Sequence, residues 1–439
     1  MDGPLFARPL LARTLACTFA AGTACAHAWH INYSLETALG YSDNINESDI
    51  DPTGQSMLIP RLKFDMQEDG ANLVAHASGQ LEYRDYLQGA FGNEFRGQFS
   101  GIATWIIFPQ RLSFDFEDYA AVEPVNIFAP NAPNNQQQVN VFTLGPTFNF
   151  RIEQTLNGRA ELRFTSSTAS ETKDFNSDRA FGALRAIKDL SPTDKLSANV
   201  EAQHVHFTDR SGGPDYDRTD AFARYQTTLS QLDVDVAAGA TRLDFDSGNA
   251  SHSGWLGRGA LSWRATPSQT LGVSALRQYS DASQDLIADP AALLAATALG
   301  NGIITGTTPI TSQVYLEKRA GASYLFHSER FLVRVEPYYK TLDYLLDPDF
   351  NQTVHGVVAG FSYRPRPLWT LAFDAGEETR DYDNVARRDE DLRLDLSFAD
   401  QLTRQWTLRL DLVRNQRNSD AQGQSYRENA AYVTAIFKR

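Results

Sequence analysis

Charged side chains recur at every second position along two neighbouring stretches near the C-terminus. In "DLRLDLSFADQLTRQWTLRLDLV", residues 391–413, leucine alternates with Arg393, Asp395, Arg409 and Asp411. Successive side chains of a β-strand point to opposite faces, so this spacing places the charges on one face and the leucines on the other. Guanidinium and carboxylate groups keep their hydration only beside water. The pattern therefore predicts strands with one watery and one apolar face.

The same alternation along the rest of the chain defines the candidate water-facing residues. They are Arg61, Lys63, Asp65, Asp115, Glu117, Asp233, Asp235, Arg334, Glu336, Arg393, Asp395, Arg409 and Asp411. Charges of both signs suit a hydrophilic polymer better than strong selection for one small ion. A second explanation stays open, because charges on adjacent strands can simply neutralise one another as cross-strand pairs.

Signals for catalysis or metal binding are weak. His204 and His206 share one strand face, but no third ligand is identifiable in the sequence. The acidic residues Asp43, Glu47 and Asp49 lack the spacing of a calcium loop. We therefore expect no catalytic residue, no metal site and no cofactor. An enzyme built on the same strands stays open as an alternative, since barrel-resident hydrolases and acyltransferases exist.

The first 28 residues have the form of a secretory signal peptide. Arg8 and Arg13 precede a short apolar run from Leu15 to Cys25, and Ala26-His27-Ala28 is a small-x-small cleavage site. The two cysteines, Cys17 and Cys25, fall inside this segment. The expected mature chain, residues 29–439, then has no disulfide and must be held by burial or backbone pairing.

Charge and hydropathy exclude two classes of partner and anchor. Residues 1–28 hold two of the 40 basic and one of the 54 acidic residues, which leaves 38 basic and 53 acidic residues in the expected mature chain. An acidic chain of this kind does not suit nucleic acid. No stretch approaches the roughly 18 consecutive apolar residues of a membrane helix. Any membrane residence must therefore be as strands.

Two kinds of connection alternate along the chain. Tight ones have centres near residues 69, 110, 155, 192, 230, 267, 328, 366 and 403. The others are long and rich in Asp, Asn, Gly and Pro, as in "YSDNINESDIDPTGQ". Alternating short and long connections are typical of an all-β, transmembrane, up-and-down antiparallel barrel with short periplasmic turns and long extracellular loops. Nine tight turns predict twenty strands in one domain over residues 29–439, with eighteen as the alternative.

Aromatic residues and prolines test this architecture. Trp105, Trp263, Trp369 and Trp406 lie beside tight turns and Trp29 starts the expected mature chain, which predicts an aromatic girdle at that rim. We expect Tyr41, Tyr83, Tyr279 and Tyr344 to form the opposite girdle. Pro60, Pro146 and Pro337 fall within predicted strands. Proline lacks the N–H that a ladder needs, so each should sit at a bulge or a strand end.

The longest connection runs from Ser280 to Gln313. Asp289-Pro290, the alanine and leucine run after it and Gly300 predict a short capped helix within this loop. Such a loop either folds into the mouth of the barrel as a constriction or packs against its rim.

One segment resembles a known family. "SLETALGYSDNINES", residues 34–48, is similar to the opening of the beta-barrel porins found with exopolysaccharide biosynthesis and export loci of Gram-negative bacteria (the beta-barrel porin 2-like family), with Gly40, Tyr41, Asp43 and Asn44 carrying the likeness. The C-terminal "AAYVTAIFKR" looks like a barrel-assembly signal strand, although Lys438 and Arg439 follow its last aromatic residue. The resemblance supplies no catalytic residue.

The resemblance implies a conduit in the outer membrane for a secreted polysaccharide. Its expected partners are outer-membrane lipid, the barrel-assembly machinery, the polysaccharide and periplasmic export proteins, and the expected state is a monomer. Three alternatives stay open: a general diffusion porin for small hydrophilic solutes, a barrel enzyme, and a surface protein acting through its loops.

Overall fold

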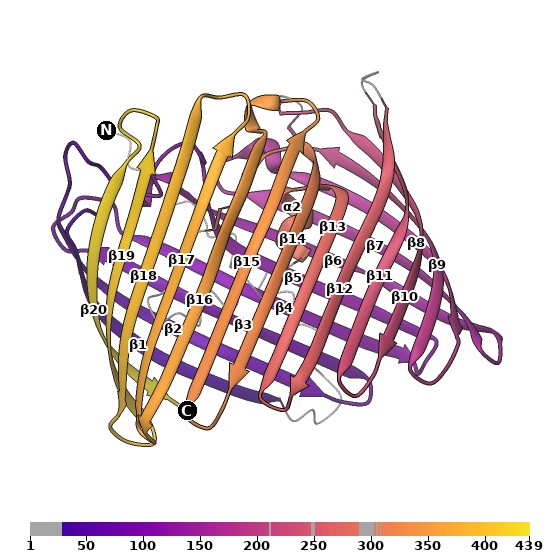
Figure 1. Ribbon diagram of the computed structural model, residues 1–439, viewed down its shortest axis with the longest axis horizontal. Coiled ribbons are helices and arrows are strands. Elements are labelled where there is room, and N and C mark those ends of the chain that lie inside the picture. Colours follow the sequence, from indigo (N-terminus) through magenta and orange to yellow (C-terminus); the bar gives the residue numbers. More distant parts are fainter. Residues whose placement is uncertain (1–28, 210–211, 247–250, 289–302, 304–305, 308) are drawn as a thin grey trace, which may run out of the picture.

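All twenty strands of the computed structural model form one antiparallel sheet that closes on itself (Figure 1). The structure describes residues 29–209, 212–246, 251–288, 303, 306–307 and 309–439. Each strand pairs with its neighbours in the chain, and β1 (His30–Ser42) closes the ring by pairing with β20 (Tyr426–Lys438). The predicted up-and-down barrel and its strand number are therefore confirmed, and the alternative of eighteen strands is wrong.

The remaining strands and the short helices follow in chain order. They are β2 (Gln55–Asp69), β3 (Leu73–Tyr86), β4 (Glu94–Phe108), β5 (Leu112–Pro124), η1 (Pro133–Asn135), β6 (Gln136–Glu153), β7 (Leu156–Ala169), η2 (Lys173–Phe175), β8 (Ser177–Asp189), β9 (Asp194–Phe207), β10 (Tyr216–Thr228), β11 (Leu232–Phe245), β12 (His252–Thr266), β13 (Gln269–Asp281), α2 (Ala282–Ala288), β14 (Val314–His327), β15 (Phe331–Tyr344), η3 (Pro348–Phe350), β16 (Gln352–Arg366), β17 (Trp369–Tyr382), β18 (Arg387–Gln401) and β19 (Trp406–Ser419).

The connections define two ends of the barrel. Nine short connections, such as residues 109–111 and 267–268, lie at one end, which we call the turn end. The long connections lie at the other, which we call the loop end, and the longest of them joins β13 to β14. All nine predicted tight turns fall within a few residues of the observed ones.

The outer face of the barrel is a belt of apolar side chains. Leu39, Leu184 and Leu396 expose 57%, 63% and 49% of their surface on this face, whereas Ala38 on the opposite face of β1 is 1% exposed. Aliphatic and aromatic groups avoid water, so an exposed belt of this kind fits a hydrocarbon surround. It follows that the barrel is of the transmembrane type. The described residues include no helix that is both long and apolar enough to cross a bilayer.

The aromatic girdles are only partly as expected. Trp29, Trp105, Trp263 and Trp406 are exposed near the turn end, in agreement with the prediction. Tyr41 lies on the exterior near the loop end, and Tyr83 packs there against the tilted ring of Phe95. The prediction was wrong for Tyr279 and Tyr344, which are 6% and 5% exposed. They pack into apolar clusters at the loop end instead.

The three prolines sit neither at the predicted bulges nor at strand ends. Pro60, Pro146 and Pro337 each pair with one neighbouring strand, through Thr37, Phe114 and Val357 respectively. On the other side each ladder has a gap, in β2–β3, β6–β7 and β14–β15. Because proline has no N–H to donate, the hydrogen-bonded pairing is interrupted on one side of each proline. The pairing with the strand on the other side is kept.

A candidate channel interior

The inner face of the barrel carries all thirteen predicted polar candidates. They alternate with residues of the outer face, as Arg61 and Lys63 do with the half-buried Leu62 on β2, and as Asp395 does with the exposed Leu396 on β18. The fold places them there because the side-chain period of a strand is two. Their role in conduction stays a prediction.

Most candidates are engaged in pairs, some between adjacent strands, as the alternative explanation of neutralisation expected, and others within one strand. Arg61 and Lys63 share Glu36, Arg409 donates to Asp411 at 2.9 Å, and Arg334 faces Glu336 at 3.9 Å. The other partners come from residues outside the predicted set. These pairs are Asp65–His76, Asp115–Arg163, Glu117–Tyr119, Asp233–Arg264, Asp235–Arg224 and Arg393–Asn415. Asp395 is 5% exposed on the same wall.

The longest loop turns into the lumen rather than over the rim. Its helix α2 lies inside the ring of strands (Figure 1), and its side chains Ala282, Leu286 and Ile287 pack on a cluster that includes Val141 and Phe175. This apolar contact fastens the loop to the inner wall of β5–β7. The predicted helix at Asp289–Gly300 lies outside the described residues, and the observed helix begins directly after β13.

Buried polar contacts hold the start of this loop. Both oxygens of Asp281 accept hydrogen bonds from the guanidinium of Arg179, at 2.7 and 2.8 Å. The hydroxyl of Tyr216 donates to the same carboxylate, and so does the backbone N–H of Gln284 at 3.1 Å. A buried charge must have such partners to offset the loss of its hydration.

The far part of the same loop reaches the opposite side of the ring. The N–H of Ile303 donates to Glu82 on β3 at 3.1 Å, and the N–H of Gly306 donates to the carbonyl of Val122 on β5 at 2.8 Å. β3 and β5 lie across the ring from β13 and β14, where the loop starts and ends. The described residues of this loop therefore contact the inner wall on opposite sides of the lumen at its loop end. They lie inside the mouth of the barrel, and the role of the loop as a constriction stays a prediction.

The two halves of the lumen differ in how much water they admit. In the loop half, inward residues such as Met57, Ile59 and Val141 are at most 1% exposed. In the turn half, the side chains of Asp65 and His76 are 47% and 57% exposed. The loops and α2 fill the first half, and the second is open to solvent.

A loop carboxyl contributes to the filling of the loop half. Glu47, in the connection from β1 to β2, has a φ of 49° and is 7% exposed. Its carboxylate accepts the N–H of Asn131 from the β5–β6 connection at 2.5 Å. Burial raises the pKa of Glu47 to about 8, and the carboxylate of Glu428 adds to the rise. The residue thus ties two loops together in its protonated form.

His204, His206 and the loop residue Asp43 are engaged in pairs with other side chains. His204 and His206 pair with Asp217 and Asp215 at 2.9 and 2.7 Å, on exposed positions of the β9–β10 hairpin. Asp43 accepts two hydrogen bonds from Asn429. Among the residues that the structure describes, no three His, Cys, Asp or Glu side chains are grouped so that they could hold a metal ion.

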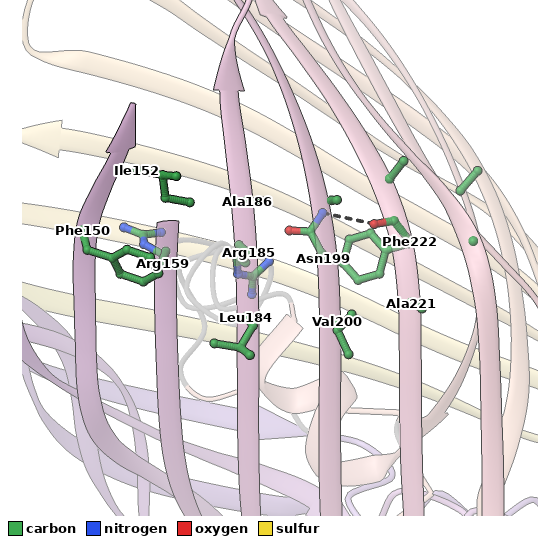
Figure 2. Close-up of a pocket in the computed structure, with 14 residues that line it drawn as sticks. Phe150, Ile152, Arg159, Leu184, Arg185, Ala186, Asn199, Val200, Ala221 and Phe222 are labelled. Carbon is green, nitrogen blue, oxygen red and sulfur yellow. Dashed lines mark hydrogen bonds between the residues drawn. The ribbon is translucent and has the colours of Figure 1, made fainter. Parts of the chain in front are cut away.

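A depression lies on the apolar outer wall of the barrel. It has a volume of about 680 Å³ and crosses β6–β11, where Phe150, Leu184 and Val200 border it (Figure 2). Its lining includes the small side chains Ala186, Ala198, Ala221, Ala223 and Ala238. Since Leu184 and Val200 belong to the exposed outer belt, this depression faces away from the lumen. Arg159, Arg185 and Asn199 also contribute to its lining.

Sequence analysis missed the inner residues of β3 and β4. Gln80, Glu82 and Arg84 alternate with Leu81 and Tyr83 in "GQLEYR", so the two-residue period could have revealed them. Their contacts with Ile303 could not have been found in this way, because 219 and 221 residues of chain separate the partners.

Comparisons with known proteins give a fold likeness alone. No protein-family profile matches the sequence. No curated protein matches it either. Among solved structures, the chain is similar to the ferric enterobactin receptor of Pseudomonas aeruginosa in complex with enterobactin, with a TM-score of 0.48, 9% identity, 93% of this chain and 81% of that chain. The FrpB iron transporter of Neisseria meningitidis (F5-1 variant) has a TM-score of 0.46 at 9% identity and covers 93% and 82%. The siderophore receptor PirA of Acinetobacter baumannii has a TM-score of 0.46 at 8% identity and covers 93% and 80%. Such scores transfer neither ligand nor mechanism to this chain.

Proposed function

We propose that this chain is an outer-membrane channel that conducts a secreted polysaccharide from the periplasm to the cell surface. The observation that supports the channel is the closed barrel of twenty strands with an apolar exterior and a charged, solvent-open lumen at its turn end. Barrels of this size enclose more space than side chains alone can fill. The cargo rests on the resemblance of residues 34–48 to exopolysaccharide-associated porins.

The lining suits a neutral or weakly charged hydrophilic polymer. Paired guanidinium and carboxylate groups, as in Arg409–Asp411 and Arg334–Glu336, offer many hydrogen bonds at little net charge. A sugar polymer carries hydroxyl groups along its whole length and can exchange hydrogen bonds with such a wall as it moves. Periplasmic export proteins would deliver it at the turn end, which is the more open mouth.

The loop between β13 and β14 must move for a polymer to pass, because its described residues lie inside the mouth of the barrel. Replacing residues 282–313 by a short turn should raise the single-channel conductance of the purified barrel several-fold in a planar bilayer. A conductance unchanged by this deletion would mean that the loop does not limit the passage, and it would contradict the conduit.

The decisive test of cargo is made in cells. Deleting the gene should remove the polysaccharide from the cell surface while polymer accumulates inside, and the intact gene should restore export.

The second candidate is a general diffusion porin, favoured by the mixed and largely paired charges of the lumen. It predicts normal surface polymer in the deletion strain and slower uptake of small hydrophilic solutes.

A further inference from the structure

The inner faces of β1–β4 carry a compact group of planar polar side chains, which we call the polar wall. Its members are Glu36, Arg61, Gln80, Glu82, Arg84 and Arg96. Gln80 and Glu82 are 1% exposed, unlike the solvent-open charges of the turn half. Planar amide, guanidinium and carboxylate groups at close quarters form a surface of fixed hydrogen-bond donors and acceptors.

Contacts within the polar wall hold two of its members in place. Arg61 donates to Glu36 at 3.0 Å and to Glu82 at 3.3 Å, so Glu82 is fixed from behind. Arg84 donates through Nε to the other oxygen of Glu82 at 2.7 Å. Charge-assisted bonds of this kind set the positions of Glu82 and Arg84 before any ligand arrives.

The backbone of Ile303, in the long loop, occupies the front of this pair. The N–H of Ile303 donates to Oε2 of Glu82 at 3.1 Å, and its carbonyl accepts from Nη2 of Arg84 at 3.2 Å. The N–H donor and the carbonyl acceptor of Ile303 thus bind a carboxylate and a guanidinium that lie side by side. Two neighbouring hydroxyl groups of a sugar ring present the same combination, since a hydroxyl both donates and accepts.

The polar wall also has hydrogen-bonding capacity left over. Oε1 of Gln80 and Nε of Arg96 are buried atoms with no hydrogen-bond partner among the described residues, and the two side chains belong to residues that are 1% and 3% exposed. Buried polar groups normally find a partner, and each one without a partner is costly. An acceptor and a donor are therefore available beside Glu82 and Arg84.

The charges of the polar wall nearly cancel. Its two carboxylates face three guanidinium groups, and Glu94 accepts from Arg96 at 2.5 Å and balances the third. Such a surface attracts neither an anion nor a cation over distance. Its chemistry selects a ligand with many hydroxyl groups and no net charge.

We propose that the polar wall binds the hydroxyl groups of an uncharged glycan, and that the glycan replaces the backbone N–H and carbonyl of Ile303 when it binds. The inference rests on the proposed conduit and names the site and the sugar class that it takes. Binding then releases the backbone of Ile303 from Glu82 and Arg84. Hydrogen bonds from the glycan replace those from Ile303, so a modest sugar concentration can shift the equilibrium between the two states.

The first experiment measures binding to the whole protein. Isomaltooligosaccharides of six to eight glucose units are added to the barrel in a planar bilayer, and the current is recorded. Each bound molecule should interrupt the current, and Arg84→Met should shorten the mean interruption roughly tenfold, the effect of losing one charge-assisted hydrogen bond. Heat-modifiable migration on a gel verifies that each variant is folded.

The matched control is Arg224→Met. Arg224 is another lumen guanidinium paired with a carboxylate, Asp235, and it makes no contact with the described part of the loop. Its replacement should leave the interruptions within about twofold of the parent. Equal shortening in both variants, or interruptions by oligogalacturonate alone, would overturn the assignment of an uncharged glycan to the polar wall.

The second experiment follows the loop. Ile303→Cys keeps the backbone N–H and carbonyl of this position and introduces a single thiol into the expected mature chain, because both native cysteines precede residue 29. A membrane-impermeant maleimide should label it several-fold faster in the presence of the oligosaccharide, and adding Arg84→Met should make labelling fast without sugar. Interruptions with unchanged labelling would refute the exchange at Ile303 while leaving the conduit intact. Loss of the conduit itself would appear separately, as normal surface polymer in the deletion strain.

Discussion

The loop half and the turn half of the lumen are built from the same strands and the same alternation, yet one is a core and the other a water-filled vestibule. In the loop half the inward residues include Met57, Val141 and Tyr315, which pack against loops and α2. In the turn half the inward residues include Asp65 and Glu336, which face solvent. The difference comes from the connections, which are long enough to fold inward at one end alone.

An ion pair of the same kind therefore contributes differently to stability in each half. Arg179–Asp281 is shielded in the loop half, with side chains 7% and 2% exposed, whereas Arg224–Asp235 has side chains 36% and 37% exposed. Breaking a shielded pair leaves an uncompensated charge in a low dielectric, whereas an open pair is replaced by water.

The largest effect is expected from removing one partner of the shielded pair. Asp281→Asn should lower the free energy of unfolding by about 3–5 kcal/mol, because Arg179 is left without its counter-charge. Asp235→Asn should lower it by less than about 1 kcal/mol. Denaturant unfolding of the two variants in lipid vesicles measures both, and similar losses at the two positions would break the distinction between the halves.

A somewhat smaller effect is expected from a charge on the outer belt. Leu394→Arg should cost about 2–4 kcal/mol and reduce the amount of assembled barrel, because a guanidinium then faces hydrocarbon. Arg393→Leu, one residue away on the inner face, should assemble normally and change the ion selectivity of the channel. Folded protein in the membrane fraction and reversal potentials provide the two readouts. The same phenotype for both would contradict the assignment of the two faces.

The smallest effect is expected from pH at the loop that carries Glu47. Its pKa in the folded barrel, about 8, lies above the ordinary value of 4.5 because burial and the carboxylate of Glu428 disfavour the charge, so the folded loop is most stable at low pH. Between about pH 4.5 and 8 the carboxyl ionises in the open loop and stays neutral in the folded loop, whereas above about 8 it is ionised in both. Protease cleavage in residues 43–54 should therefore accelerate as pH rises from about 4.5 to about 8 and level off above that.

Two variants test this pH dependence. Glu47→Gln should abolish it, since the amide cannot ionise, and the cleavage rate should stay low across the range. Asp49→Asn is the matched control, because Asp49 is exposed in the same loop. It should retain the parent's response. An unaltered response in Glu47→Gln would assign the effect to another group.

The periodic features of the fold could be predicted from sequence. The alternation of leucine with Arg393 and Asp395 gave the inner and outer faces, and the tight turns gave the strand number. Both depend on neighbours within a few residues. The positions of Tyr279 and Tyr344 could not be found in this way, because apolar clusters formed by distant strands bury them.

The contacts of the long loop inside the lumen could not be predicted from local sequence patterns either. The sequence named the loop but not its path, since its anchors are the Arg179–Asp281 pair and the carboxylate of Glu82. The prediction placed the three prolines correctly within strands, but the expected bulges and strand ends are not observed. Each residue of the barrel has a neighbouring strand on both sides, so Pro60 keeps its pairing with β1 and only the pairing between β2 and β3 is interrupted.

The seam between β1 and β20 sets the order in which this barrel must form. Nine residue pairs join these strands, against thirteen between β1 and β2, and the paired residues lie about 400 positions apart in the chain. Closing so distant a contact costs more chain entropy than any hairpin does. Hairpins should therefore zip up first and the seam last, and amide hydrogens along β1 and β20 should exchange with solvent before those of the interior hairpins.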